Sequence, residues 1–354
     1  MIEIVQLLTS AVEMEAADIY IVAGRNITFK VHGRLVTVGE GRLMSLDTER
    51  LVSDIYTLAG NRDITALLRT GDDDFSFALS GVSRFRVSSY KQRSSLAAVI
   101  RIVTFELPDP IAIGIPPTVL ELADRTKGMI LVTGPAGSGK STTLACMIDQ
   151  INRTYYNHII TLEDPLEYLH RHDRSIVSQR EIHSDTESYV KALRAALRQS
   201  PDVILLGEMR DYETINVAMT AAETGHLVIS TLHTVGAVNT IDRIIDAFPP
   251  SQQHQIRVQL SMVLQAVISQ QLIPTVNQNV VPAFEIMICN SAIRNMIRES
   301  KVHQMDTVIQ SSAGEGMITM DSSLLELYRA NVISERDAIS YSVNPEIIAK
   351  KLKQ

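Results

Sequence analysis

The sequence lacks the features that mark exported, zinc-binding and membrane-spanning proteins. It holds only two cysteines, Cys146 and Cys289, and no C-x-x-C pattern, so it predicts reduced thiols and no zinc site. No apolar run reaches the roughly 20 residues that span a bilayer, and the first residues carry acids where a signal peptide carries basic residues. We therefore expect a cytoplasmic protein that is not inserted into a membrane.

The chain also lacks an excess of basic charge. Its 33 Lys and Arg residues face 40 Asp and Glu residues, a formal charge of −7, and the excess acid lies beyond residue 105. Motors that track nucleic acid usually carry a basic stripe, so this balance argues against a nucleic-acid partner. No low-complexity tract interrupts a composition that is 45% hydrophobic and 21% charged, which is typical of globular proteins.

The 354 residues favour two domains joined by a proline-rich seam. Residues 106–117, "ELPDPIAIGIPP", hold four of the 12 prolines and predict a linker. Before the seam, residues 1–105 show short alternating strands and one helix-like insert, which predicts an α+β domain on an antiparallel sheet. After it, residues 118–354 alternate strand and helix, the pattern of a mostly parallel sheet and an α/β fold.

Local signals predict turns and the ends of two helices. Ser184 and Glu187 have the spacing of a capping box before a helix that Pro201 ends. Asp211 stands where it can cap the next helix. The acidic run Asp72–Asp74 is expected in a hairpin turn, because no glycine and glutamate follow at the spacing of a Ca²⁺ loop.

The segment "ILVTGPAGSGKSTTL" has the full G-x-x-x-x-G-K-S spacing of a phosphate-binding loop between a strand and a helix. Glycines let the backbone wrap the phosphates, while the lysine reaches the β- and γ-oxygens and the serine binds Mg²⁺. A simple glycine-rich turn is the alternative. The spacing predicts an ATP site that comprises Gly134, Ala136, Gly137, Ser138, Gly139, Lys140, Ser141 and Thr142.

Three later strands end in groups that can do chemistry. "HIITLEDP" ends in Glu163 and Asp164, "VILLGE" in Glu208, and "LVISTLH" in His233. In a doubly wound sheet the carboxyl ends of the strands line the ligand crevice, so a carboxylate there can order and deprotonate water. A turn cap is the alternative for each single residue. The usual strand-end aspartate that helps to hold Mg²⁺ is replaced by Gly207.

Four motifs together resemble those of the secretion-superfamily ATPases. They are "GPAGSGKST", "ITLEDPLEY", "LRQSPDVILLGEMRD" and "TAAETGHLVISTLHT", which look like the Walker A, Asp box, atypical Walker B and His box of that family. The resemblance implies a PAS-like N-terminal domain and a RecA-like ATPase domain. It also implies Glu163 as catalytic glutamate, Glu208 near Mg²⁺ with Ser141, and His226 and His233 as His-box residues.

The same resemblance implies that arginines of the N-terminal sheet reach nucleotide at a domain or subunit interface. Arg86 and Arg101 best match those positions, and Arg84 shares a strand face with Arg86. An arginine fork suits triphosphate oxygens. A solvated sheet face is the alternative for these residues.

The segment "AIRNMIRES", residues 292–300, resembles the "AIRNLIRE" segment of type IV pilus retraction ATPases of the PilT type. This resemblance implies a cytoplasmic homo-hexamer at the inner face of the cytoplasmic membrane. Its implied partners are an inner-membrane pilus platform protein and, as a further candidate, a second retraction ATPase. Open alternatives are a pilus-assembly or secretion ATPase, a RecA-like nucleic-acid motor, and a non-hydrolysing subunit of a mixed ring.

Helical spacing in this segment predicts one apolar stripe and one basic face. Ile293, Met296 and Ile297 fall at i, i+3 and i+4, and Arg294 and Arg298 stand four apart. Either the stripe packs into the core and the charges are solvated, or a loosely packed helix passes motion to the pilus base. The resemblance favours the second interpretation.

Overall fold

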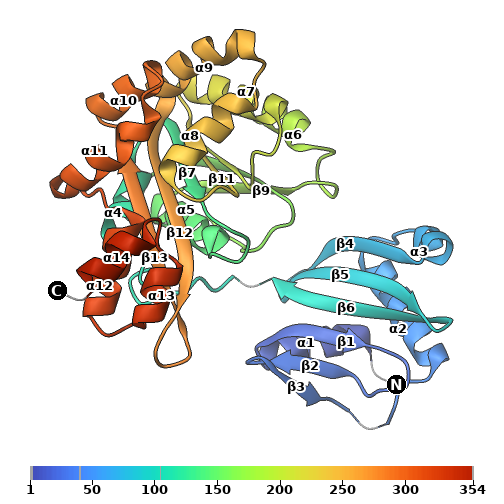
Figure 1. The fold of residues 1–354 in the computed structure, drawn as a ribbon. Coiled ribbons are helices and arrows are strands. Elements are labelled where there is room, and N and C mark those ends of the chain that lie inside the picture. Colours follow the sequence, from blue (N-terminus) through green and yellow to red (C-terminus); the bar gives the residue numbers. More distant parts are fainter. Residues whose placement is uncertain (1–2, 40, 104, 353–354) are drawn as a thin grey trace. The chain divides into compact units, whose positions relative to one another are not determined.

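The computed structural model describes residues 3–39, 41–103 and 105–352 (Figure 1). The chain forms two compact units, Met1–Glu106 with Glu167–Leu169, and Leu107–Leu166 with His170–Gln354. The outermost residues of the predicted domains, 1 and 354, lie outside the described residues. Most of the expected linker belongs to the second unit, where Ile115 is buried in an apolar cluster.

The first unit is an antiparallel sheet covered by helices. The strands run in the order β3-β2-β1-β6-β5-β4, and every neighbouring pair is antiparallel. The elements are α1 Ile4–Glu13, β1 Ala16–Ile21, β2 Thr28–Val31, β3 Arg34–Thr37, α2 Ser45–Leu58, α3 Thr65–Thr70, β4 Asp72–Leu79, β5 Ser83–Gln92 and β6 Ser95–Val103. The antiparallel α+β prediction is confirmed for this unit. Its PAS-like classification stays a prediction.

The expectation of a hairpin turn at Asp72–Asp74 is wrong, because all three residues lie within strand β4. Asp73 binds Arg62 through two oxygens, at 2.8 and 2.9 Å, and accepts a hydrogen bond from the Tyr56 hydroxyl at 2.8 Å. The Arg62 guanidinium lowers the pKa of the Asp73 carboxyl. Asp73 therefore ties strand β4 to α2 and to the segment after it.

The second unit is built on a seven-stranded sheet of order β13-β12-β7-β11-β10-β8-β9. All neighbouring pairs are parallel except β12 with β13. The strands are β7 Gly128–Thr133, β8 His158–Glu163, β9 Ile176–Glu181, β10 Val203–Leu206, β11 Leu227–Leu232, β12 Leu264–Pro274 and β13 Val280–Ile288. The predicted α/β class with a mostly parallel sheet is confirmed.

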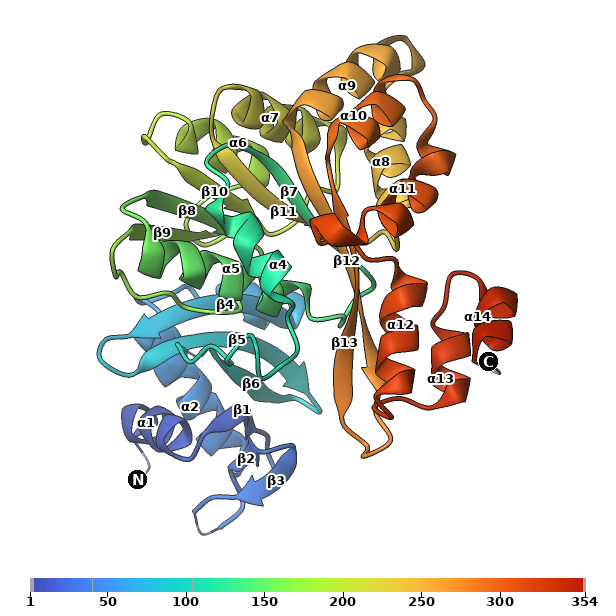
Figure 2. The same cartoon turned by 90° about the vertical axis from the view of Figure 1, so that its left-hand side faces the viewer.

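Helices cover both faces of this sheet (Figures 1 and 2). They are α4 Pro117–Glu121, α5 Lys140–Thr154, α6 Tyr189–Ala196, α7 Tyr212–Glu223, α8 Ala237–Asp246, α9 Pro250–Val263, α10 Ser291–Arg298, α11 Met305–Ser311, α12 Met320–Arg329, α13 Glu335–Ser340 and α14 Pro345–Lys351. Alternate residues of the central strands point to opposite faces: Ile130 packs with α4 and α5, whereas Leu131 packs with α6 to α11. The central strands have continuous apolar runs because both of their faces are buried. No described helix is long and apolar enough to cross a membrane.

The two predicted helix caps have different outcomes. Asp211 caps α7 as expected, accepting from the Thr214 backbone N–H at 2.9 Å. The capping box at Ser184 is wrong, because α6 begins later and Ser188 is its N-cap, accepting from the Lys191 backbone N–H. The Ser184 hydroxyl instead donates to Glu181, because this residue lies in the turn after β9.

Helix α10 carries the "AIRNMIRES" segment and is firmly packed. Ile293 and Ile297 are fully buried in the apolar core, and Met296 packs against it, so the expectation of a loosely held helix is wrong. Arg294 is not merely solvated either. Its guanidinium donates to the backbone carbonyls of Ser261 and Met262, at 2.7 and 3.0 Å, which are orphan acceptors near the end of α9.

Candidate active site

The phosphate loop lies between the fully buried strand β7 and helix α5, whose first residue is Lys140. Gly134, the first loop residue, has φ +142° and lies directly beside strand β12. A Cβ added there would come within 2.2 Å of the Gln270 carbonyl oxygen, so only glycine fits this close approach. Packing therefore requires the first of the glycines predicted from spacing, whereas a Cβ at Gly137 would meet nothing within 4 Å.

The predicted phosphate-binding side chains lie at the start of α5. The Lys140 Nζ donates to the carbonyl oxygens of Gly134 and Pro135, at 2.9 and 2.8 Å, which holds the ammonium group inside the loop. Ser141 and Thr142 are half-buried in the first turn, and Ala136 with Gly137 forms the exposed tip of the loop. A helix N-terminus offers unpaired N–H groups and positive potential to an anion.

An apolar pocket of about 550 Å³ adjoins the loop. Gly139 and Thr142 line its phosphate-loop side. The remaining walls come from the 111–115 segment and from β12 and β13, and include Ile113, Leu272, Val281, Pro282 and Phe284. Most ligand pockets have such apolar walls with a few polar groups, so this one suits the planar base of a nucleotide. Sequence motifs missed it because its walls come from separate segments.

Two of the predicted carboxylates converge at the carboxyl ends of adjacent strands β8 and β10. The Thr161 hydroxyl donates to Glu163 Oε1 at 2.7 Å, which orients this half-buried carboxylate. Gly207 follows β10, and its backbone N–H donates to the Leu162 carbonyl at 2.8 Å. Glu208 comes next in the chain, so parallel pairing brings Glu163 and Glu208 together at the carboxyl ends of the strands, which we call the acidic edge.

Glu208 lies between two basic groups. It is 8% exposed, its Oε1 is 2.5 Å from Arg210, and its Oε2 is 3.4 Å from His233 Nε2. The Oε2 atom is buried and accepts no hydrogen bond from the part of the chain that the structure describes. Because buried polar atoms are normally satisfied, this oxygen is available to water or a cation.

Tyr189, the first residue of α6, joins this site and was missed by the sequence reasoning. Its hydroxyl lies 2.7 Å from where a Cβ of Gly207 would stand. Burial raises the pKa of the Tyr189 hydroxyl, and the charges of Glu208, Asp164 and Glu163 raise it further. Tyr189 therefore faces the acidic edge as a neutral phenol, and it fills the space that a side chain at position 207 would need.

The two predicted His-box residues lie at opposite ends of strand β11. His233 follows the carboxyl end of β11 and contacts Glu208, as expected for a site residue. His226 precedes the amino end of β11, where its Nδ1 is 2.9 Å from the Ala221 carbonyl oxygen, near the end of α7. The structure does not bring His226 to the acidic edge of its own chain, because the whole strand separates the two histidines.

Arg86 and Arg101 are directly opposite each other on strands β5 and β6 of the first unit. Both side chains are exposed on one face of the sheet. Arg101 Nε donates to Asp18 Oδ1 at 2.9 Å, and Lys30 lies 3.8 Å from the same carboxylate. One buried acid therefore faces two basic groups, and like charges directly opposite on a sheet are unfavourable without a counter-charge. The nucleotide role of both arginines stays a prediction.

The donor atoms fit the expected Mg²⁺ ion in type. Ser141 offers a hydroxyl and Glu208 a carboxylate oxygen, and Mg²⁺ prefers such oxygens together with waters and substrate phosphates. Across the described residues, no group of three or more His, Cys, Asp and Glu side chains could hold a metal alone.

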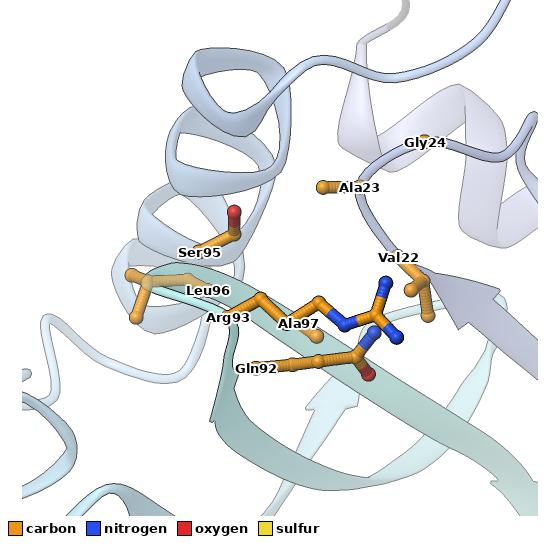
Figure 3. Close-up of a pocket in the computed structure, with 8 residues that line it drawn as sticks. All are labelled: Val22, Ala23, Gly24, Gln92, Arg93, Ser95, Leu96 and Ala97. Carbon is orange, nitrogen blue, oxygen red and sulfur yellow. The ribbon is translucent and has the colours of Figure 1, made fainter.

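A second pocket of about 200 Å³ lies in the first unit (Figure 3). Its lining residues come from the segment after β1, Val22 to Gly24, and from the β5–β6 turn around Arg93. None of its described lining residues is an acid or a histidine, and it belongs to a different unit from the phosphate loop. We assign it no part in nucleotide chemistry.

Comparisons with known proteins identify the family of this chain. A family model described as "Type II/IV secretion system protein" matches residues 1–335. The "Type IV pilus retractation ATPase PilT" of Pseudomonas aeruginosa is 43% identical over 97% of this chain and 99% of its own. The "Twitching motility protein" of Neisseria gonorrhoeae is 42% identical over 96% of this chain and 90% of its own.

A comparison with solved structures finds the same similarity to a pilus retraction protein. The "Crystal Structure of the Pilus Retraction Motor PilT and Bound ADP" matches with a TM-score of 0.89 and 45% identity, covering 99% of this chain and 100% of that one. That motor was solved with ADP bound, so a protein of this fold binds an adenine nucleotide. The family match covers most of the chain, and the phosphate loop and acidic edge are both present. This chain is therefore a P-loop ATPase that belongs to the type II/IV secretion system protein family.

Proposed function

We propose that this chain is a cytoplasmic motor that hydrolyses ATP to retract type IV pili and thereby drives twitching motility. The observation that carries the proposal is the similarity over almost the whole chain to proteins named for pilus retraction and twitching, combined with a complete phosphate loop and acidic edge. Shorter similarity to secretion ATPases, 35% identity over 68% of this chain for a type II secretion protein E of Klebsiella pneumoniae, supports assembly or secretion less well.

The nucleotide binds with its phosphates on the loop and its base in the apolar pocket. Lys140 already lies inside the loop, so a small movement of its ammonium group from the Gly134 carbonyl toward phosphate oxygens exchanges one set of acceptors for a more strongly charged one. The N–H groups at the start of α5 supply further donors. The pocket formed with Leu272 and Phe284 removes the base from water.

Hydrolysis uses the acidic edge. Glu163, oriented by Thr161, accepts a proton from the attacking water, which is the general-base role of a strand-end carboxylate. Mg²⁺ neutralises the phosphate charge when bound, and Ser141 with Glu208 would hold it. His233 contacts Glu208 and links this carboxylate to the segment before α8. Gly207 keeps this edge open to the Tyr189 phenol.

Arg86 and Arg101 complete the site across a subunit interface in a homo-hexamer. The proposal is supported by the exposed basic face of the first unit, where a triphosphate would add negative charge to that of Asp18. The ring acts at the inner face of the cytoplasmic membrane on a pilus platform protein, and a second retraction ATPase is a further candidate partner. The net charge of −7 gives no support to a nucleic-acid partner.

The phenotype of a gene deletion distinguishes a role in pilus retraction from a role in pilus assembly. We expect cells without the protein to keep surface pili but to lose twitching, and the parent gene to restore twitching while the Lys140→Ala variant does not. An assembly or secretion role predicts loss of surface pili or of secreted proteins instead. Light scattering of the purified protein should give the mass of six 39.2 kDa chains when nucleotide is present.

A further inference from the structure

Gln270, on strand β12, lies beside the phosphate loop but belongs to no nucleotide-binding motif. Strand pairing sets Ser269 opposite Thr133, so Gln270 follows at the level of Gly134. The residue is 2% exposed. A side chain of this polarity is seldom so deeply buried unless its amide is hydrogen-bonded at both ends.

Both ends of the Gln270 amide are bound to phosphate-loop elements. Its Nε2 donates to the Ser138 carbonyl at 2.5 Å, and its Oε1 accepts from the Thr143 hydroxyl at 2.8 Å. The Ser138 carbonyl can only accept, so the nitrogen must face it and the orientation of the amide is fixed. The Gln270 side chain thus joins the loop to the first turn of α5.

The bond to Ser138 determines where the next peptide N–H points. In a trans peptide the Ser138 carbonyl and the Gly139 N–H point in opposite directions. Holding the carbonyl toward β12 therefore turns the Gly139 N–H away from β12, the side on which we expect the phosphates. Phosphate binding at a helix N-terminus needs its N–H groups to face that side.

We propose that Gln270 is a positioning residue that fixes the phosphate loop in its anion-binding conformation through the Ser138 carbonyl and the Thr143 hydroxyl. This inference rests on the proposed nucleotide site. It adds strand β12 to the elements that shape the phosphate-binding site, because a shift of this strand would reorient loop N–H groups without any change in the loop sequence.

The test compares two neighbouring glutamines. Gln270→Met keeps the unbranched shape of the side chain but removes its N–H and C=O groups. Gln271→Met is the matched control, since the Gln271 amide donates away from the loop, to the Tyr341 carbonyl at 3.3 Å. We expect the dissociation constant of Mg-ADP, measured by calorimetry, to rise about tenfold or more in Gln270→Met, because a buried loop carbonyl loses its donor. It should stay within about twofold of the parent in Gln271→Met.

Thr143→Val keeps the test decisive if Gln270→Met does not fold. It removes one of the two bonds and should weaken Mg-ADP binding by a smaller factor, while the double variant should bind no worse than Gln270→Met alone. Equal Mg-ADP affinity in parent, Gln270→Met and Thr143→Val would overturn the inference. So would a loss of affinity that tracks a lower melting temperature of the nucleotide-free protein. A parent that fails to bind Mg-ADP would overturn the proposed phosphate site itself.

Discussion

Gly207 stands where a Walker B aspartate is usual, and the structure gives its presence a steric reason. A Cβ added at this position would lie 2.7 Å from the Tyr189 hydroxyl oxygen, about 0.7 Å closer than ordinary van der Waals contact. The half-buried ring of Tyr189 packs against the core, so moving its hydroxyl away would disturb this packing. We expect Gly207→Ala to destabilise the second unit by about 1–3 kcal/mol, which is typical of overpacking.

Thermal unfolding measures this effect. For a unit of this size, about 1 kcal/mol lowers the melting temperature by roughly 2–4 °C. Tyr189→Phe removes the hydroxyl and makes room for a Cβ at position 207. In that background Gly207→Ala should therefore lower the free energy of unfolding by less than half as much. Gly314→Ala is the matched control, because a Cβ there meets nothing within 4 Å. Equal destabilisation by Gly207→Ala in both backgrounds would refute the steric explanation, since an independent pair shows no coupling energy.

Four further predictions concern catalysis and packing. Lys140→Ala should abolish ATP turnover and leave the circular dichroism spectrum unchanged; turnover at the parental rate would exclude this phosphate site. Glu163→Gln should keep nucleotide affinity but slow hydrolysis by about 10²–10⁴, and near-normal turnover would move the base elsewhere. Mixing Arg101→Ala and Lys140→Ala subunits should restore some turnover if the arginine acts in trans, and no recovery in confirmed mixed rings would contradict this. Arg294→Ala should lower the melting temperature, because carbonyls near the end of α9 lose their donor, whereas Arg298→Ala should not; equal effects would contradict the capping role.

The parts of the site that the sequence predicts are those that depend on neighbours in the chain. The phosphate loop needs its glycines, lysine and serine at fixed spacing, and Glu163, Glu208 and His233 each follow an apolar run, so all were predictable. The sequence predicts the strands of both sheets for the same reason, because the spacing of apolar residues along each strand is a local pattern.

The residues that the sequence could not predict act on distant partners. The Gln270 amide bonds a carbonyl 132 positions away, and Tyr189 meets Gly207 through a different strand and helix. No periodicity encodes such pairs. Arg294 reaches the end of α9 for the same reason, and the "AIRNMIRES" helix is packed more firmly than its resemblance implied. Local signals also compete: Ser184 and Ser188 are both good caps, and only the tertiary position of α6 decides between them.

Imaging of labelled pili in living cells tests the central claim most directly. Cells that lack the chromosomal gene should show no retraction events, cells complemented with the parent should regain them, and cells with Glu163→Gln should keep extended pili that do not retract, although the variant still binds nucleotide. Retraction at the parental frequency and speed in the Glu163→Gln cells, with turnover of the purified variant confirmed as lost, would contradict a motor driven by ATP hydrolysis at this acidic edge.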